Sequence, residues 1–194
     1  LLHIIKNYII IKKLQSASTD YVSSQNYNTK SIETNKNNGI ITRDYYKKDD
    51  KQVLILLDES NEKTSKTSFY NNGTSMDYLY IDNSGLKDFL TFSDLKLDES
   101  IFDYFGGKSN WEILLNCFTA NIKSTTLNGK KCYIVKNFNS TTLAYNESNH
   151  TAYIEKDTGL LTKYDSSDKT FEITYDFNNV SDKIFEEPSL ENYT

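Results

Sequence analysis

The chain has little arginine, histidine, cysteine or proline. Arg43 is the only arginine in 194 residues, and the formal net charge at pH 7 is −5. A protein that binds nucleic acid needs a concentration of Lys and Arg, because those side chains neutralise the phosphates. Nucleic acid is therefore not an expected partner.

The usual signatures of catalysis and of metal binding are also missing. His3 and His150 are the only histidines, and neither has a second metal-type ligand at a recognisable spacing. The sequence contains no Gly-rich phosphate loop, no G-x-S-x-G elbow and no H-E-x-x-H motif. We therefore expect no metal, no cofactor and no enzymatic activity.

Cys117 and Cys132 are the only cysteines, and the sequence leaves two states open for them. A disulfide would close a loop that contributes about 3 kcal/mol on the chain-entropy model. A hairpin turn at Asn128-Gly129 would place Thr125 opposite Cys132, so the bridge would require the segment around Cys117 to fold back over the sheet. The alternative is two reduced, half-buried thiols.

No apolar run reaches the ~20 residues that span a bilayer. The densest one, LLHIIKNYIIIKKL, has its apolar residues at helical spacing and predicts a helix over residues 1–24. We expect its apolar stripe to dock on a core rather than on a membrane; the stripe comprises Leu1, Ile4, Ile5, Tyr8, Ile11 and Leu14. The chain does not begin with Met, so a signal or lipid-anchor segment is expected upstream of Leu1 if one exists.

What the chain has in quantity is aromatic residues in alternating patterns. Residues 151–188 read as three antiparallel strands, and the last one alternates between large apolar and polar side chains. Its apolar positions are Phe171, Ile173, Tyr175 and Phe177, and its polar ones are Glu172, Thr174 and Asp176. A period of two indicates a sheet with one buried face.

The rest of the chain predicts further hairpins and two short helices. A first strand group over residues 25–82 comprises strands at 27–34, 40–48, 51–58, 67–72 and 74–82, with a hairpin turn at Asn72-Gly73. A helical plug over 83–119 follows, with helices that begin near Asp98 and Ser109 and are separated by Gly106-Gly107. A second strand group occupies 120–188 and includes a strand near 140–146.

No linker divides residues 1–194, so we expect a single α+β domain. The predicted fold is a curved antiparallel β-sheet, a half-barrel built as a meander. The N-terminal helix and the two short helices would lie on its concave face, because an amphipathic helix needs a surface to cover.

The element order and four phrases resemble the bacterial lipoprotein-carrier (LolA-like) superfamily, which includes periplasmic lipid-binding lipoproteins. The phrases are NGKKCYIVK (128–136), AYIEKDTGLLTKYD (152–165), ITYDFNNV (173–180) and IFEEP (184–188). The resemblance implies a half-barrel whose concave face holds acyl chains. Carriers of this superfamily use a lid arginine near the end of an early strand. Here that strand ends Tyr46-Lys47-Lys48 and Arg43 lies earlier, so the lid role is not assigned to Arg43.

The leading hypothesis is non-enzymatic, extracytoplasmic binding of a lipid or other apolar small molecule. The expected ligand-binding residues are Met76, Tyr78, Tyr80, Phe102, Phe105, Trp111, Leu114, Phe118, Phe171, Ile173, Tyr175 and Phe177. The residues from Phe102 to Phe118 would form a movable plug. The alternative interpretation is that the whole set forms an ordinary closed core. The alternative hypothesis is an envelope protein–protein interaction or sensor module without a ligand. In either case we expect a bacterial cell-surface or membrane-anchored protein, held through an anchor outside these residues.

Overall fold

The computed structural model describes residues 1–23, 26–35, 39–60, 63–71, 73, 77–83, 86–92, 104–139, 149–189, 191 and 193. The chain divides into two compact units. The first unit comprises Leu1–Ser24 and Asp98–Thr170, and the second comprises Gln25–Leu97 and Phe171–Thr194. Buried apolar side chains form a core in each of them.

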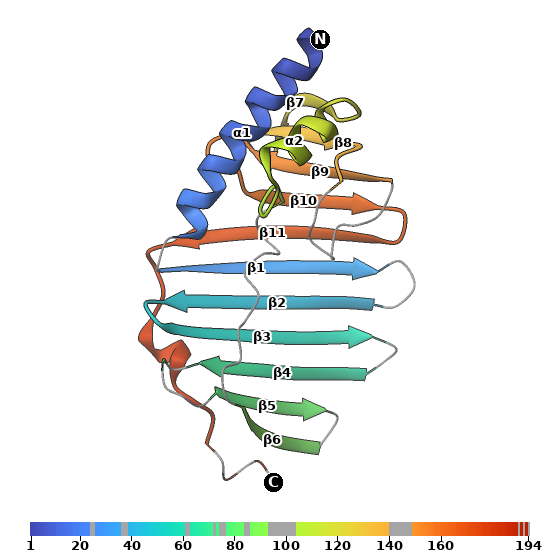
Figure 1. The fold of residues 1–194 in the computed structure, drawn as a ribbon. Coiled ribbons are helices and arrows are strands. Elements are labelled where there is room, and N and C mark those ends of the chain that lie inside the picture. The colour runs from blue at the N-terminus through green and yellow to red at the C-terminus, as the bar shows by residue number, and fades with distance from the viewer. Residues whose placement is uncertain are drawn as a thin grey trace. The chain divides into compact units, whose positions relative to one another are not determined.

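The first unit contains two α-helices and four antiparallel strands. The helices are α1 (Leu2–Val22) and α2 (Asn110–Cys117), and the strands are β7 (Asn121–Leu127), β8 (Lys130–Lys136), β9 (His150–Glu155) and β10 (Leu161–Ser166). Each strand pairs with its neighbour in sequence, so β7 to β10 form a meander. Figure 1 shows both helices on the same side of these strands.

The turn between β7 and β8 has the predicted geometry. Leu127 pairs with Lys130, so Asn128 and Gly129 form a two-residue loop. Both residues have positive φ, 50° and 79°, as a type I′ turn requires. Thr125 lies opposite Cys132, which confirms the register derived from the sequence.

Aromatic rings fill the core of the first unit. Tyr104 contacts Phe105 edge-on at 5.1 Å between ring centroids, and Phe105 contacts Phe138 at the same distance. The Tyr104 hydroxyl is hydrogen-bonded to Nε2 of His150, whose ring stacks on Tyr164 at 4.9 Å. His150 is therefore a buried member of this core.

Helix α1 packs through a face that overlaps the predicted stripe without matching it: Ile11 and Leu14 are buried, and Ile4 and Tyr8 are half-buried. Its buried residues recur at helical spacing and are Asn7, Ile11, Leu14 and Ser18. Leu1 and Ile5, which belong to the predicted stripe, are exposed. The prediction weighed hydrophobicity alone, whereas Asn7 is buried because its side chain donates to the carbonyls of Ala120 and Cys117, at 2.8 and 3.3 Å.

The second unit contains the remaining strands and a short 3-10 helix. Its elements are β1 (Asn26–Asn35), β2 (Gly39–Lys48), β3 (Lys51–Ser60), β4 (Lys63–Asn71), β5 (Asp77–Asn83), β6 (Leu86–Phe92), most of β11 (Lys169–Phe177) and η3 (Asp182–Phe185). Their order is β6-β5-β4-β3-β2-β1-β11. Strand β11 lies next to β1, as shown by hydrogen bonds from Asn178 N to Asn26 O and from Thr174 Oγ1 to Lys30 O.

Strand β6 and the connection before β5 depart from the sequence prediction. Residues 86–92 were expected to start the helical plug, but they pair with β5 from Asn83↔Leu86 to Asp77↔Phe92. These residues form a strand because they pair with the edge of β5 that β4 does not occupy. The hairpin predicted at Asn72-Gly73 is present, because β4 pairs with β5, but Asn71 pairs with Asp77 and the connection therefore has five residues.

Two other predicted elements lie largely outside the described residues. The strand near 140–146 falls entirely outside them, as does most of the helix expected to begin at Asp98. The end of that helix, Tyr104 and Phe105, lies in a turn. The second predicted helix is present as α2 and begins after Ser109, as the capping pattern indicates.

The C-terminal segment covers one face of the second unit. Phe185 of η3 packs into a cluster with Val53, Tyr70 and Tyr80. The Tyr80 hydroxyl donates to Glu187 at 3.0 Å, and Lys48 forms an ion pair with Asp182 at 2.8 Å. The segment is thus attached by apolar and polar contacts together.

The α+β class and the antiparallel meander are confirmed. The half-barrel curvature and the single-domain organisation stay predictions. Among the described residues, no helix combines the length and apolarity that a membrane span needs.

Candidate functional site

The candidate site is the face of the second unit that points away from Phe185, here called the Arg43 face. Residues directly opposite each other on paired strands share a face, so the register defines it. Thr29 pairs with Tyr45, Tyr45 with Leu54, and Leu54 with Phe69. The Arg43 face includes Tyr27, Thr29, Ser31, Glu33, Ile41, Arg43, Tyr45, Lys47, Leu54, Leu56, Asp58, Thr67, Phe69, Leu79, Phe171, Ile173, Tyr175 and Phe177.

Strand β11 supplies the aromatic edge of this face. Burial alternates along the strand as predicted: its apolar side chains are buried or half-buried, while Glu172, Thr174 and Asp176 are exposed. The Phe177 ring lies 6.0 Å from that of Tyr27, and the Tyr27 ring lies 5.8 Å from that of Tyr45. These contacts place the β11 aromatics on the same face as β1 and β2.

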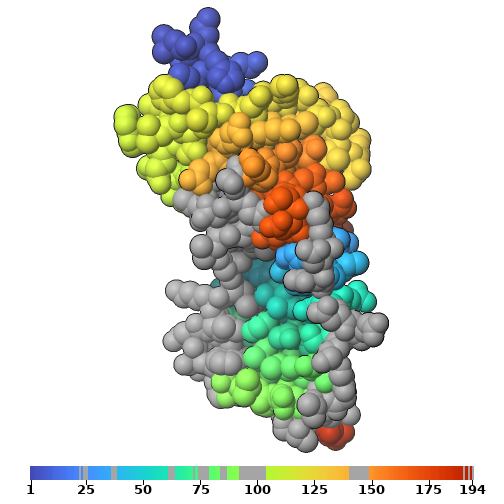
Figure 2. Space-filling view, turned by 90° about the vertical axis from the view of Figure 1, so that its right-hand side faces the viewer, coloured from blue at the N-terminus to red at the C-terminus, as the bar shows by residue number. Residues whose placement is uncertain are grey.

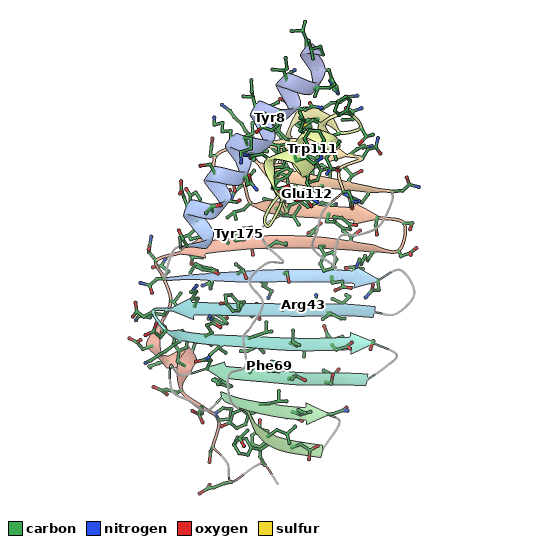
Figure 3. All side chains as sticks on the ribbon, viewed as in Figure 1. Tyr8, Arg43, Phe69, Trp111, Glu112 and Tyr175 are labelled. Atoms are coloured by element: carbon green, nitrogen blue, oxygen red, sulfur yellow. The ribbon has the colours of Figure 1, made fainter. Side chains whose placement is uncertain are left out.

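Strand β1 carries a strip of polar side chains through this apolar surface. Thr29, Ser31 and Glu33 occupy alternate positions, and all three are buried. Arg43 reaches Glu33 from β2, with 2.7 Å between Nη2 and Oε2. Its guanidinium carbon also lies 5.8 Å from the centroid of the Phe171 ring, within range of a cation–π contact. Figure 3 labels Arg43 on β2 and Tyr175 on β11, the two strands on either side of β1, and Phe69 on β4.

Four polar atoms of the Arg43 face are buried and have no hydrogen-bond partner within the described part of the chain. They are Thr29 Oγ1, Ser31 Oγ, Arg43 Nη1 and Asp58 Oδ1. Each such atom costs about 1–3 kcal/mol when it is left without a partner in the folded state. Because native proteins pair nearly all buried polar groups, four such atoms on one face make this face the candidate site.

These four side chains are neighbours on adjoining strands. Ser31 is the direct cross-strand partner of Arg43. Arg43 pairs with Leu56 of β3, and Asp58 is two residues further along, so it lies diagonally across from Arg43 on the same face. The strip therefore presents hydroxyls, one N–H group and one carboxylate oxygen within a small area.

Some predicted ligand-binding residues do not belong to the Arg43 face. Tyr80 pairs with Ser68 and lies in the Val53 cluster on the opposite face, whereas its neighbour Leu79 pairs with Phe69. The structure therefore does not bring Tyr80 together with Phe171. Met76, Phe102 and the side chain of Tyr78 lie outside the described residues.

The predicted plug residues lie in the first unit and divide between its core and its surface. Phe105 is fully buried and Leu114 half-buried. Helix α2 turns Ile113 and Cys117 inward, while Trp111 and Phe118 are 66% and 61% exposed on its outer side together with Leu115. Figure 2 shows the first turns of α1 standing clear of the rest of this unit, which agrees with the exposure of Leu1, Leu2 and Ile5.

The start of α2 is fixed by a reciprocal cap. Ser109 Oγ accepts from the Glu112 N–H at 3.3 Å, and Glu112 Oε2 accepts from the Ser109 N–H at 2.8 Å. Hydrogen bonds from Ser109 lower the pKa of Glu112, the side-chain bond having the larger effect. Close by, burial lowers the pKa of Lys108, although Glu112 acts in the opposite direction.

Cys117 and Cys132 are both free thiols and both buried. Burial is the main cause that raises the pKa of each thiol. The described residues contain no group of three or more His, Cys, Asp or Glu side chains placed to hold a metal ion.

Sequence reasoning missed the polar strip. Strand β1 carries polar residues on both of its faces: Thr29 and Ser31 lie on one face, and Asn28 and Lys30 lie on the other. A hydrophobic pattern of period two is therefore absent, and only the pairing partners show which face is buried. One signal in the sequence could have indicated the ion pair: Arg43 is the only arginine, and the predicted strand before it contains the acidic residue Glu33.

Two solved structures resemble this chain. One is a DUF1329 family protein from Desulfovibrio piger ATCC 29098, at 15% identity and a TM-score of 0.31, over 95% of this chain and 97% of that one. The other is a LolA superfamily protein from Nitrosomonas europaea, at 9% identity and a TM-score of 0.26, over 92% of this chain and 98% of that one. Neither a protein-family model nor a curated protein sequence matches the chain.

The second likeness carries the superfamily name that the sequence resemblance suggests. Both TM-scores lie well below 0.5, so the function proposed next rests on the side chains of the chain itself.

Proposed function

We propose that the chain is a non-enzymatic protein that binds a lipid or another apolar small molecule on the Arg43 face. The observation that carries this proposal is the combination of aromatic and aliphatic side chains around a strip of buried polar groups without partners. Ligand sites typically have such a lining, with an apolar wall and a few placed polar groups.

Half-buried side chains supply the apolar contact area. Leu54, Leu56, Phe69 and Tyr175 all keep part of their surface accessible. Covering them with an acyl chain removes apolar area from water, which contributes about 0.8 kcal/mol for each CH₂ group that is buried. Binding therefore needs no reaction at the site and no bound metal ion.

An extracytoplasmic location at the bacterial cell envelope belongs to the same proposal. Its support is the sequence resemblance to periplasmic lipid-binding proteins. Contact with the membrane would occur through an anchor outside these residues.

A ligand titration with paired variants tests the proposal. The gently extracted protein is examined by native mass spectrometry, and the delipidated protein is then titrated with a fluorescent fatty-acid analogue. Leu56→Gln should weaken binding at least about tenfold, because it places an amide on the apolar wall. Phe118→Gln, on the outer side of α2, is the matched control and should leave binding unchanged. A ligand-free native mass together with no saturable binding would contradict the proposal.

A second candidate function is a protein-interaction module, and helix α2 favours it. Trp111, Leu115 and Phe118 form an exposed apolar stripe at i, i+4 and i+7. Aromatic residues exposed in this way are typical of partner contacts. Trp111→Ala would weaken the binding of an envelope partner and leave the affinity for the fatty-acid analogue unchanged.

A further inference from the structure

We propose that the polar strip of the Arg43 face binds the uncharged, hydroxyl-bearing head group of an acyl lipid, such as a monoacylglycerol. This inference rests on the proposed function and names the ligand class. Its basis is the set of four buried polar atoms without partners: Thr29 Oγ1, Ser31 Oγ, Arg43 Nη1 and Asp58 Oδ1.

The strip offers both donors and an acceptor. Arg43 Nη1 can only donate, and the Thr29 and Ser31 hydroxyls can donate or accept. Asp58 Oδ1, when ionised, can only accept. A ligand that satisfies all four atoms must therefore carry an oxygen that accepts and a hydroxyl that donates. An ester carbonyl beside a free hydroxyl has this pattern.

The charges of the strip favour a neutral head group. Arg43 is already paired with Glu33 at 2.7 Å, and the carboxylate of Asp58 lies on the same face. Lys47, opposite Tyr27 on the same face, adds a second positive charge, so the face carries two positive and two negative side chains in balance. A phosphate or a carboxylate would face two like charges, and an ammonium group would face Arg43, so an uncharged group fits best.

Apolar side chains flank the strip on both sides, where the acyl chain would lie. Phe171 of β11 contacts Arg43 from one side, and Leu54 and Leu56 of β3 lie on the other. Burial of Thr29 and Ser31, at 2% and 1% exposure, makes bulk water a poor partner for their hydroxyls. A ligand group that takes these hydrogen bonds gains specificity, because analogues that lack it leave the site unsatisfied.

The test compares three ligands of equal chain length: 1-monopalmitoylglycerol, methyl palmitate and palmitate. Calorimetric or fluorescence-displacement titrations are run at pH 8 on the wild type, on Ser31→Ala and on Thr29→Val. The wild type should bind the monoacylglycerol at least about tenfold more tightly than the methyl ester. Either variant should remove most of that preference, because the preference depends on hydrogen bonds to the free hydroxyl groups that the methyl ester lacks. Thr42→Val, on the opposite face of β2, is the matched control and should keep the preference.

Asp58→Asn tests the charge argument separately, because the amide keeps an acceptor oxygen and loses the negative charge. This variant should raise the affinity for palmitate several-fold relative to the affinity for the monoacylglycerol.

Equal affinity of the wild type for monoacylglycerol and methyl ester would overturn the inference while the proposed function stands. A preference that survives in both hydroxyl variants would also overturn the inference. It would show that ordered water, and not the ligand, forms hydrogen bonds with the buried atoms. Failure of all three ligands to bind would overturn the inference and the proposed function together.

Discussion

Ser31 and Arg43 lie directly opposite each other on β1 and β2, yet no hydrogen bond joins the Ser31 hydroxyl to the guanidinium. Arg43 instead directs Nη2 to Glu33, two residues further along β1. A pair of neighbours that could satisfy each other and do not is unusual for buried groups. The arrangement holds the arginine in place and leaves the hydroxyl available to a third group.

The ion pair between Arg43 and Glu33 should stabilise the second unit. We expect Glu33→Gln to lower the free energy of unfolding by about 1–3 kcal/mol, because it leaves a largely buried guanidinium without its carboxylate partner. Urea unfolding followed by circular dichroism measures this change. Asp176→Asn, on the exposed side of β11, should stay within about 0.5 kcal/mol of the wild type. Equal effects of the two substitutions would show that the pair contributes nothing.

Gly159 permits the close approach of α1 to the turn between β9 and β10. Its φ is +71°, and a Cβ atom there would lie 2.1 Å from the Leu14 carbonyl oxygen. Gly159→Ala should therefore cost about 4 kcal/mol or more, since the backbone of α1 has to shift. Gly129→Ala is a matched control: its φ is +79° but no atom lies within 4 Å of the new Cβ. Only the backbone strain of about 1–2 kcal/mol should appear there in thermal unfolding.

The cap of α2 should set the titration of Glu112. Its pKa in the folded state is lowered by the hydrogen bonds from Ser109. The contribution of Glu112 to stability is therefore present above its unfolded-state pKa and is lost as the pH falls through the folded-state value. Ser109→Ala should raise the pKa of Glu112 toward its ordinary value, which carboxyl ¹³C NMR titration can detect. Thr126→Ala on β7 should leave that pKa unchanged.

Loss of the Ser109 cap should also destabilise α2 by about 1 kcal/mol, the usual effect of removing a serine N-cap. An unchanged titration of Glu112 in Ser109→Ala would contradict the reciprocal cap.

The two cysteines should behave as protected, reduced thiols. Burial raises the pKa of both Cys117 and Cys132, so the thiolate fraction at pH 8 is reduced, and steric access is low as well. Ellman's reagent should react slowly with the native protein and should titrate two thiols per chain in guanidinium chloride. An intact, non-reduced mass lower by two hydrogen atoms would instead establish the disulfide that the sequence leaves open.

Local sequence signals predicted the hairpins well because their causes are local. Asn128-Gly129 adopts the two positive φ angles that its residues favour, and the alternation of β11 appears directly in burial. Strand β6 was missed because its strand conformation depends on pairing with β5, which no local pattern shows.

Sequence reasoning failed where contacts between residues far apart in the chain decide which side chains are buried. Asn7 replaces an apolar residue on the buried side of α1, because the carbonyls of Cys117 and Ala120 lie within its reach. The sequence groups Tyr80 with Phe171, but the register places the two side chains on opposite faces of their strands. The polar strip around Ser31 was invisible for the same reason, since only the pairing of β1 with β2 reveals its neighbours.

A titration of the isotopically labelled chain with 1-monopalmitoylglycerol, followed by amide and side-chain NMR shifts, tests the central claim most directly. Saturable shifts should concentrate at Thr29, Ser31 and Arg43 and extend to Phe171. Shifts confined to Trp111 and Phe118 of α2, or no saturable shift at any residue, would contradict binding on the Arg43 face.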